Sequence, residues 1–481
     1  MSEVINAFPG YEYIRLEDGK YHNMYRGTDV GRGGYVYAEP GIYSNVALLD
    51  VRNMHGESIV RLNKLGDATK TYAEIREARN AIKAHDFDTA RKLLDGKLAK
   101  FLNDENEADK LANGLKLILN STYGIAAASF DNPLRDPRDV NNIIALRGAL
   151  FMRTLQDEII DRGFRGVHYK TDSVKVPNAT PEIIEFIMDF GKKYGYEFEH
   201  EATYERMCLV NDAVYIARYD ERGVRNKGGK HANEWTATGA QFQQPYVFKT
   251  LFSGEPLEFA DLCETKSVTS GAIYLDMNEE CPDVTEEESE LEKLCKKSGI
   301  DINDILKCEH DQRCILELKP EQIPYMNEAI RIRKIVATGH SYQFVGRVGL
   351  FFPVKEGRGG GVMLREKNGK YYAVTGTKGY RWLEAETIKT LHRENDLDSR
   401  YHNDLANEAI KAIDKFGSFE RFIDISKPYD YSATLINDLP FDLVPCGDPK
   451  RSSCIECPNL VNDICKRGYS LNSYLEKGGD V

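Results

Sequence analysis

Alternating apolar and polar positions predict β-strands in two parts of the chain. GGYVYAEPGIY (33–43) alternates between Gly and Pro residues, and SNVALLDV (44–51) continues as a strand-like run that closes near an acid, Asp50. In FRGVHYKTDSVKV (164–176), apolar residues flank a short polar tip, which predicts a β-hairpin with Asp172 at its turn. The pattern therefore places one acid at a strand end and another at a hairpin tip.

Helical spacing dominates between these two regions. A basic helix is expected over residues 71–102, and a second helix follows the polar turn NDENE (103–107). The two helices are expected to be antiparallel because a short turn joins them. A further helix is expected over residues 141–162, just ahead of the hairpin.

The second helix carries KLILNSTYG (116–124), which has an unusual polar face. Lys116, Asn120 and Tyr123 recur at i, i+4 and i+7, so they share one side of the helix. That side lacks the usual solubilising mixture of charges, and we interpret it as a binding surface. The residues expected on the opposite face are Leu115, Ile118, Leu119 and Thr122.

Composition limits the classes of partner. A chain of 481 residues exceeds the size of a single hydrophobic core, so several domains are expected. The net charge of -12 argues against a wholly basic nucleic-acid coat but allows a local basic channel. No apolar run is long enough to span a bilayer, and the start of the chain has no signal-peptide pattern, so a cytoplasmic protein without a membrane partner is expected.

A basic and aromatic stretch, residues 331–381, changes this picture locally. It holds eleven Lys and Arg against two Glu, interleaved with Tyr and Phe and followed by Trp382. Cations that bind phosphates, next to rings that stack on bases, are typical of nucleic-acid binding.

Near the end of the chain, four cysteines have metal-ligand spacing. Cys454 and Cys457 form a Cys-x-x-Cys pair, with Cys446 and Cys465 placed symmetrically outside it. Four thiolates at such spacing suit one tetrahedral Zn²⁺. An iron–sulfur cluster and simple reduced cysteines are the alternatives.

The two acids could act together. A strand-end carboxylate beside a hairpin-tip carboxylate could hold two divalent cations for a phosphoryl displacement, with Lys116 on a triphosphate. For Asp172 alone, the alternative is an ordinary Asx-type turn residue.

Several segments together resemble the motifs of family B DNA polymerases. KLILNSTYG resembles their fingers-helix motif, LLDVRNMHGESIV (48–60) the palm motif that opens with an Asp, and HYKTDS (168–173) the palm hairpin. The similarity covers about residues 30–255. Three further segments resemble the region before the palm and the strands that grip the primer: GGYVYAEPGIY, LVNDAVYIARY (209–219) and WTATG (235–239).

The resemblance implies a catalytic centre with two Mg²⁺ ions. Asp50 and Asp172 would be the catalytic, metal-binding carboxylates, with the carbonyl of Val51 as a further ligand. Thr171 and Tyr215 would contact the primer.

The resemblance also implies a nucleotide site on the fingers. Lys116 would contact the phosphates of a deoxynucleoside triphosphate, Asn120 and Tyr123 would lie against the nascent base pair, and Gly124 would allow close approach of the duplex. A second set of triphosphate contacts shares one face of the first helix, for which a solvated basic face is the alternative. This set is Arg76, Arg79 and Lys83.

Three positions depart from the family pattern. Lys170 replaces the first acid of the hairpin motif, His55 stands where a Tyr normally blocks a ribose 2′-hydroxyl, and Asp212 stands where a Lys often meets the primer. Metal affinity, sugar selectivity and the primer contact are the properties that these changes affect.

The fold implied is an α+β right-hand polymerase with an antiparallel-sheet palm, two-helix fingers, a helical thumb, a C-terminal α+β region and a small four-cysteine metal knot. Only 49 residues precede Asp50, so no exonuclease domain is expected. The expected domains are palm 1–62, fingers 63–124, palm 125–245, thumb 246–335, a basic domain 336–435 and the four-cysteine tail 436–481.

The function expected is template-directed extension of a primer on DNA, in phage replication in a bacterial cytoplasm. A separate exonuclease chain and replication accessory proteins are expected partners. Two alternatives stay open: a primase or RNA-synthesising polymerase, indicated by His55, and a non-catalytic template-binding subunit, indicated by Lys170 together with His55.

Overall fold

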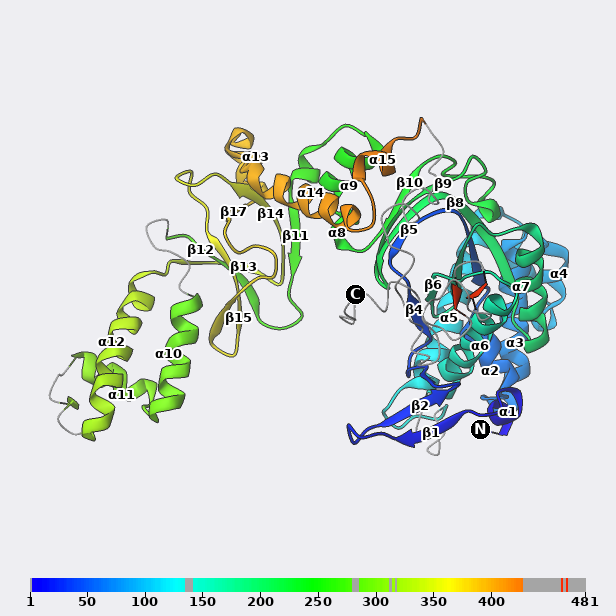
Figure 1. The fold of residues 1–481 in the computed structure, drawn as a ribbon, viewed down its shortest axis with the longest axis horizontal. Helices are drawn as coiled ribbons and strands as arrows, with labels where there is room; N and C mark the ends of the chain where they lie inside the picture. Colours follow the sequence, from blue (N-terminus) through cyan, green and yellow to red (C-terminus); the bar gives the residue numbers. More distant parts are fainter. Residues whose placement is uncertain are drawn as a thin grey trace. The chain divides into compact units, whose positions relative to one another are not determined.

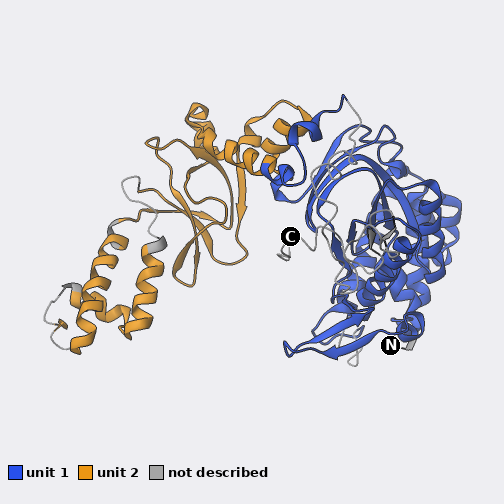
Figure 2. Cartoon of the chain, in the orientation of Figure 1, with its two compact units in different colours: residues 1–242, 411–481 blue, residues 243–410 orange. Residues whose placement is uncertain are grey.

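The computed structural model describes residues 2–134, 142–278, 285–310, 314–315, 318–426, 460–461 and 464–465. The chain forms two compact units, residues 1–242 with 411–481 and residues 243–410 (Figure 2). Among the described helices, none is long and apolar enough to cross a membrane.

A seven-stranded, fully antiparallel sheet organises the first unit, in the order β10-β9-β8-β5-β7-β6-β4 (Figure 1). This sheet confirms the α+β class. The strands are β4 (Val36–Ala38), β5 (Gly41–Val51), β6 (His168–Lys170), β7 (Ser173–Pro177), β8 (Phe198–Asn211), β9 (Val214–Tyr219) and β10 (Trp235–Thr238).

Two helices, α6 (Ile143–Asp161) and α7 (Pro181–Tyr194), cover one face of the sheet. Alternate strand residues such as Leu49 of β5 and Val174 of β7 are fully buried in this core with Leu150 of α6. Side chains at the intervening positions, Asp50 among them, point to the other face. That second face is the one that carries the candidate site.

The expected helices after β5 are present, but the first one is divided. The structure has α2 (Met54–Arg61), α3 (Thr69–Lys83), α4 (Phe87–Lys92) and α5 (Glu105–Ala127). A single helix over 71–102 was wrong: His85 has a positive φ of 56°, and the side chain of Asp86 accepts from the N–H of Thr89 to cap α4. Local capping thus breaks a pattern that is helical on both sides.

The apolar face of α5 is narrower than expected. Leu115 is buried in a cluster with α3 and Leu119 in the main core of the first unit, whereas Ile118 is 50% exposed and Thr122 is half-buried. At about 100° per residue, Ile118 lies well to the side of the buried stripe. Assigning it to the buried face was therefore wrong.

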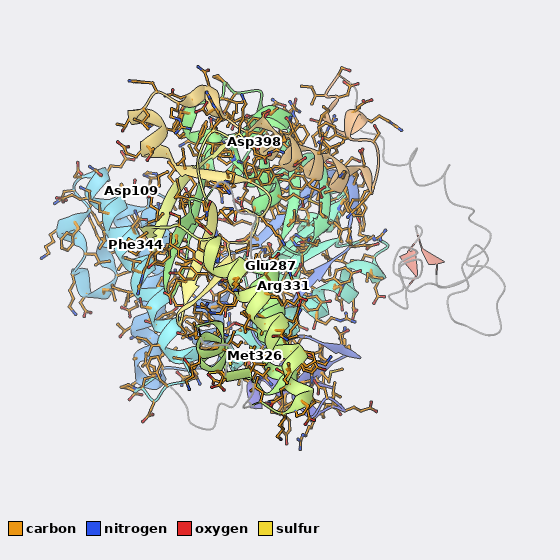
Figure 3. The ribbon with its side chains drawn as sticks, turned by 90° about the vertical axis from the view of Figure 1, so that its left-hand side faces the viewer. Asp109, Glu287, Met326, Arg331, Phe344 and Asp398 are labelled. Carbon is orange, nitrogen blue, oxygen red and sulfur yellow. The ribbon has the colours of Figure 1, made fainter. Side chains whose placement is uncertain are left out.

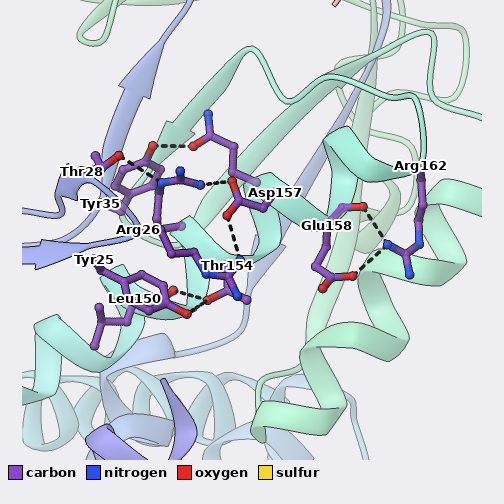
Figure 4. A network of polar contacts seen from close by, with 11 residues as sticks. Tyr25, Arg26, Thr28, Tyr35, Leu150, Thr154, Asp157, Glu158 and Arg162 are labelled. Carbon is purple, nitrogen blue, oxygen red and sulfur yellow. Dashed lines mark hydrogen bonds and ion pairs between the residues drawn. The ribbon is translucent and has the colours of Figure 1, made fainter. Parts of the chain in front are cut away.

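The N-terminal strands pack on α6 through polar contacts. They are β1 (Glu12–Arg15), β2 (Tyr21–Tyr25) and β3 (Thr28–Asp29), and they follow α1 (Ser2–Ala7). Nη1 of Arg26 lies 2.8 Å from Oδ2 of Asp157, and the Tyr35 hydroxyl donates to Oε1 of Gln156 at 2.5 Å. Figure 4 shows Arg26, Tyr35 and Asp157 in this polar network. The first contact holds the turn between β2 and β3 on α6, and the second holds the Gly-Gly-Tyr segment there.

The second unit contains two small antiparallel sheets. Their orders are β11-β14-β17 and β13-β12-β15-β16, and Ile273, Phe351 and Trp382 are buried between them. The strands are β11 (Glu264–Ser267), β12 (Ala272–Asp276), β13 (Tyr342–Gly346), β14 (Val348–Val354), β15 (Val362–Lys367), β16 (Lys370–Ala373) and β17 (Arg381–Glu384). Short helices α8 (Ala240–Gln243) and α9 (Pro245–Phe248) come before them, and α13 (Ala385–Thr390) and α14 (Ser399–Asp414) after them.

Three further helices of this unit, α10 (Thr285–Ser298), α11 (Ile302–His310) and α12 (Ile323–Thr338), pack around Met326 and Ile305. The segment expected as a helical thumb, 246–335, therefore also contains the strands β11 and β12. Its expected end lies inside α12.

The last described elements are α15 (Phe419–Ile423), β18 (Leu460–Val461) and β19 (Ile464–Cys465). Buried Arg206 of β8 donates to the main-chain oxygens of Phe422 and Asp424, which fixes α15 on the sheet. Cys446, Cys454 and Cys457 lie outside the described residues, and of Cys465 only the strand is described. The zinc site stays a prediction.

We predict that Gly34→Ala destabilises the first unit by about 1–3 kcal/mol. Gly34 has a φ of 142°, and an added Cβ would lie 2.9 Å from Cγ2 of Thr171 at the hairpin tip. Gly33→Ala is the matched control, because a Cβ there meets no atom within 4 Å. Urea unfolding of both variants checks this: equal midpoints would show that the close approach to Thr171 is not tight.

Candidate active site

Asp50 and Asp172 lie side by side. Asp50 is paired in register with Ser173, the residue after Asp172. The N–H of Val51 also donates to the main-chain oxygen of Asp172 at 2.8 Å. The structure thus brings together the two acids that the strand and hairpin patterns singled out.

The hairpin tip is held from a second side. Thr171 has a φ of 58°, a left-handed conformation that is uncommon for a non-glycine residue, and its N–H donates to the carbonyl of Tyr35 at 2.9 Å. The N–H of Asp172 donates to the carbonyl of Lys170 at 2.7 Å. These bonds set the direction of the tip and, with it, the position of Asp172.

The carboxylates are crowded and partly buried. Burial is the main cause that raises the pKa of Asp50 to about 8, and the charge of Asp172 adds to it. Burial likewise raises the pKa of Asp172. Glu201 on β8 increases both shifts, and Glu199 increases that of Asp50.

The glutamates on β8 were missed from the sequence. Glu199 is occupied by ion pairing with Arg52 and accepts from Asn226 at 3.0 Å. The side chain of Glu201 has no hydrogen bond or ion pair to another described residue. The alternating acids in FEHE (198–201) were the available signal, but only the pairing of β8 with β5 brings them to Asp50.

The carboxylates of Asp50 and Asp172 suit Mg²⁺ as a pair of ligands that leaves its other coordination positions open. Across the described part of the chain, no three His, Cys, Asp or Glu side chains are grouped to hold a metal ion. Mg²⁺, however, is commonly bound by one or two carboxylates together with water and substrate phosphates. Asp50 and Asp172 match that smaller set, and a divalent cation would relieve the repulsion between them.

A stacked pair of rings lies on the helical side. His55 of α2 and Tyr123 of α5 have ring centroids 4.2 Å apart at 18°. The amide of Asn142, at the start of α6, donates to the Tyr123 hydroxyl at 3.0 Å. Burial lowers the pKa of His55, so its ring is neutral at pH 7. Two residues expected at the nucleotide are therefore in contact.

The rest of the polar face of α5 is open. Lys116 and Asn120 are exposed, and a Cβ placed on Gly124 would meet no protein atom within 4 Å. This side of the helix therefore has room for a bound molecule.

Two of the three cations on α3 that are expected at the triphosphate form ion pairs within the protein. Arg76 forms a half-buried ion pair with Glu57 at 2.5 Å, and Lys83 an exposed one with Asp109 at 3.6 Å. Arg79 has a buried Nε with no hydrogen-bond partner among the described residues. Of the three cations expected at the triphosphate, Arg79 is the one that the structure leaves without an ion pair in this part of the chain.

Of the two expected primer contacts, Thr171 lies beside the acids and Tyr215 lies beside Lys175. Thr171 forms the hairpin tip next to Asp172. The Tyr215 ring centroid on β9 lies 4.7 Å from Nζ of Lys175, a buried lysine of β7. Lys170, which replaces the family's first acid, is exposed.

The basic stretch 331–381 is less available than its composition suggests. Arg331 pairs with Glu328, and Arg358 pairs with Asp396. On the β15–β16 hairpin, exposed Arg365 lies over the ring of exposed Tyr372, 5.7 Å from its centroid. Separately, Phe344 of β13 is 64% exposed (Figure 3).

Comparison with known proteins adds little. No protein-family model matches the chain, and no curated protein matches it. One solved structure with similarity is the family B DNA polymerase from the hyperthermophilic archaeon Pyrobaculum calidifontis, with a TM-score of 0.39 and 12% identity. The match covers 86% of this chain and 49% of that one, so the chain spans about half of that polymerase. A similarity this low decides neither fold nor activity, so any proposed function depends on the residues of the site.

The raised pKa of Asp50 predicts a pH-dependent stability of the metal-free protein. An Asp in the unfolded chain has a pKa of about 3.9. The pKa of Asp50 in the folded state is higher, at about 8, so the folded state holds this proton more tightly. The Asp50 contribution is therefore present at low pH and is lost as the pH rises toward about 8.

In EDTA, Asp50→Asn is expected to unfold at a higher temperature than the unaltered protein at pH 8, with the difference shrinking toward pH 4. Thermal unfolding across this range checks it, with the exposed Asp67→Asn as control. Parallel pH profiles for Asp50→Asn and the unaltered protein would contradict the burial and crowding of this carboxyl.

Proposed function

We propose that the chain is a DNA polymerase that extends a primer 3′ end on a template by two-metal phosphoryl transfer. The observation that carries this proposal is the juxtaposition of Asp50 and Asp172, joined through the Val51–Asp172 main-chain bond. Two partly buried carboxylates at one end of a sheet are a costly arrangement without a cation. When bound, two Mg²⁺ ions would stabilise the attacking and leaving oxygens.

The chain's own groups then have separable roles. Asp50 and Asp172 hold the metal pair, with the Val51 carbonyl as the further ligand. Exposed Lys116 and half-buried Arg79 attract the triphosphate. The stacked His55 and Tyr123 rings form a flat surface for the nascent base pair and its sugar.

Two observations favour alternative functions. His55 is a smaller ring than the family's Tyr, which favours the RNA-synthesising alternative. Lys170 in place of an acid favours a non-catalytic subunit, although the pair Asp50 and Asp172 is complete without it. The phage role, the cytoplasmic location, the protein partners and the four-cysteine zinc site stay predictions from the sequence.

Asp50→Ala and Asp172→Ala are each expected to slow single-turnover primer extension about 10³-fold or more, on the order of 4 kcal/mol. Template binding should persist, because most of its energy comes from phosphate contacts elsewhere. The measurement is extension across a Mg²⁺ titration, with the exposed Asp67→Asn as control. Near-normal rates for either Ala variant would remove the proposed catalytic pair.

His55→Tyr is expected to improve rejection of ribonucleotides, because a larger ring in the same stack reaches closer to the sugar. Competing incorporation of ribo- and deoxynucleotides by both proteins measures this selectivity. Equal discrimination would show that His55 does not face the 2′-hydroxyl. Preference of the unaltered chain for ribonucleotides would favour the RNA-synthesising alternative.

A further inference from the structure

Lys175 is a buried cation on the same side of the sheet as the candidate catalytic acids. It lies on β7, opposite Leu48 of β5, while Asp50 lies opposite Ser173. Asp50 and Lys175 are thus diagonal neighbours on one face, within reach of a long side chain. Only 3% of Lys175 is exposed.

The partners that hold the ammonium group are neutral. Its Nζ lies 3.0 Å from Nδ1 of His168 and 4.7 Å from the ring centroid of Tyr215. Nε2 of His168 lies 3.1 Å from the main-chain oxygen of Asp212, so we assign the ring proton to Nε2, which donates to that oxygen. Nδ1 is then the acceptor for Lys175. Burial and Lys175 itself lower the pKa of His168 to about 3, in agreement with a neutral ring.

No carboxylate forms an ion pair with Lys175 in the described part of the chain. Its charge nevertheless interacts favourably with Asp50, Glu201 and Asp172, which counteract the cost of burying it. The same interaction is seen from the acids, because Lys175 opposes the pKa shifts of Asp50 and Asp172. A cation is therefore fixed near the acids without occupying their oxygens.

We propose that Lys175 is a built-in counter-cation of this site, which offsets repulsion among Asp50, Asp172 and Glu201 in the metal-free protein and lowers their affinity for divalent cations. Tight metal binding would then need the added negative charge of a nucleotide triphosphate. This inference rests on the proposed function, since it takes Asp50 and Asp172 as metal ligands.

A purely structural lysine, which only fills space between His168 and Tyr215, would leave metal affinity unchanged. The test therefore measures Mn²⁺ binding by the full-length chain without nucleotide, from the electron paramagnetic resonance signal of free Mn²⁺. Lys175→Met and Lys175→Gln both remove the charge at similar length. Lys175→Arg keeps it, and Lys193→Met removes an exposed charge from α7, outside the candidate site.

The charge-removing variants are expected to bind Mn²⁺ about tenfold more tightly or better, because a nearby like charge is lost in a partly buried site. Lys175→Arg and Lys193→Met are expected to stay within about twofold of the unaltered chain, since the first keeps the buried charge and the second removes an exposed, screened one. Adding a nonreactive deoxynucleoside triphosphate should narrow the difference between Lys175→Met and the unaltered chain.

Unchanged or weaker Mn²⁺ binding by the folded Lys175→Met or Lys175→Gln variant would overturn this role. Asp50→Ala separates that failure from failure of the proposed function. If Asp50→Ala loses Mn²⁺ while the neutral Lys175 variants bind as before, the metal site stands and the counter-cation does not. If Asp50→Ala binds Mn²⁺ normally, the metal site itself is wrong, and the role of Lys175 is overturned with it.

Discussion

The hydrogen bond from the N–H of Val51 to the main-chain oxygen of Asp172 is the constraint on which the candidate site depends. It ties the end of β5 to a hairpin that lies more than a hundred residues later in the chain. Because both partners are main-chain atoms, the bond places Asp50 and Asp172 together without using either carboxylate. Their oxygens stay available to bind something else.

The residues around that bond explain why the hairpin tip has a fixed position and why bringing the two acids together costs free energy. The Tyr35 carbonyl accepts from Thr171 and holds the tip, while Gly34 passes too close for any side chain. The result is a cluster of acids in which burial, together with repulsion between the carboxylates, raises the pKa of Asp50 and Asp172. Lys175 near them supplies one compensating charge, and bound metal ions would supply the rest.

The sequence predicted those parts of the site that depend on local pattern. Asp50 at a strand end, Asp172 at a hairpin tip and the polar side of α5 all follow from periodicity and turn chemistry. Contacts between distant segments could not be predicted in this way. Glu201 reaches the acids only through pairing of β8 with β5, and the stack of His55 on Tyr123 depends on how α2 packs against α5.

The errors in the fold have the same physical origin. The break after α3 depends on the cap formed by Asp86 and Thr89, a short signal inside a longer helical pattern. The strands β11 and β12 were missed because their partners, β14 and β15, follow about ninety residues later. A strand without its neighbours in view is hard to distinguish from a buried helical segment.

The most direct test of the account is a crystal structure of the full chain with primer–template DNA, a nonreactive deoxynucleoside triphosphate and Mn²⁺, with the metal positions taken from anomalous scattering. We expect two Mn²⁺ ions about 3.5–4 Å apart, both bound by Asp50 and Asp172, with the triphosphate on the side of Lys116. Metal ions bound elsewhere, or a nucleotide that does not approach these two carboxylates, would contradict it.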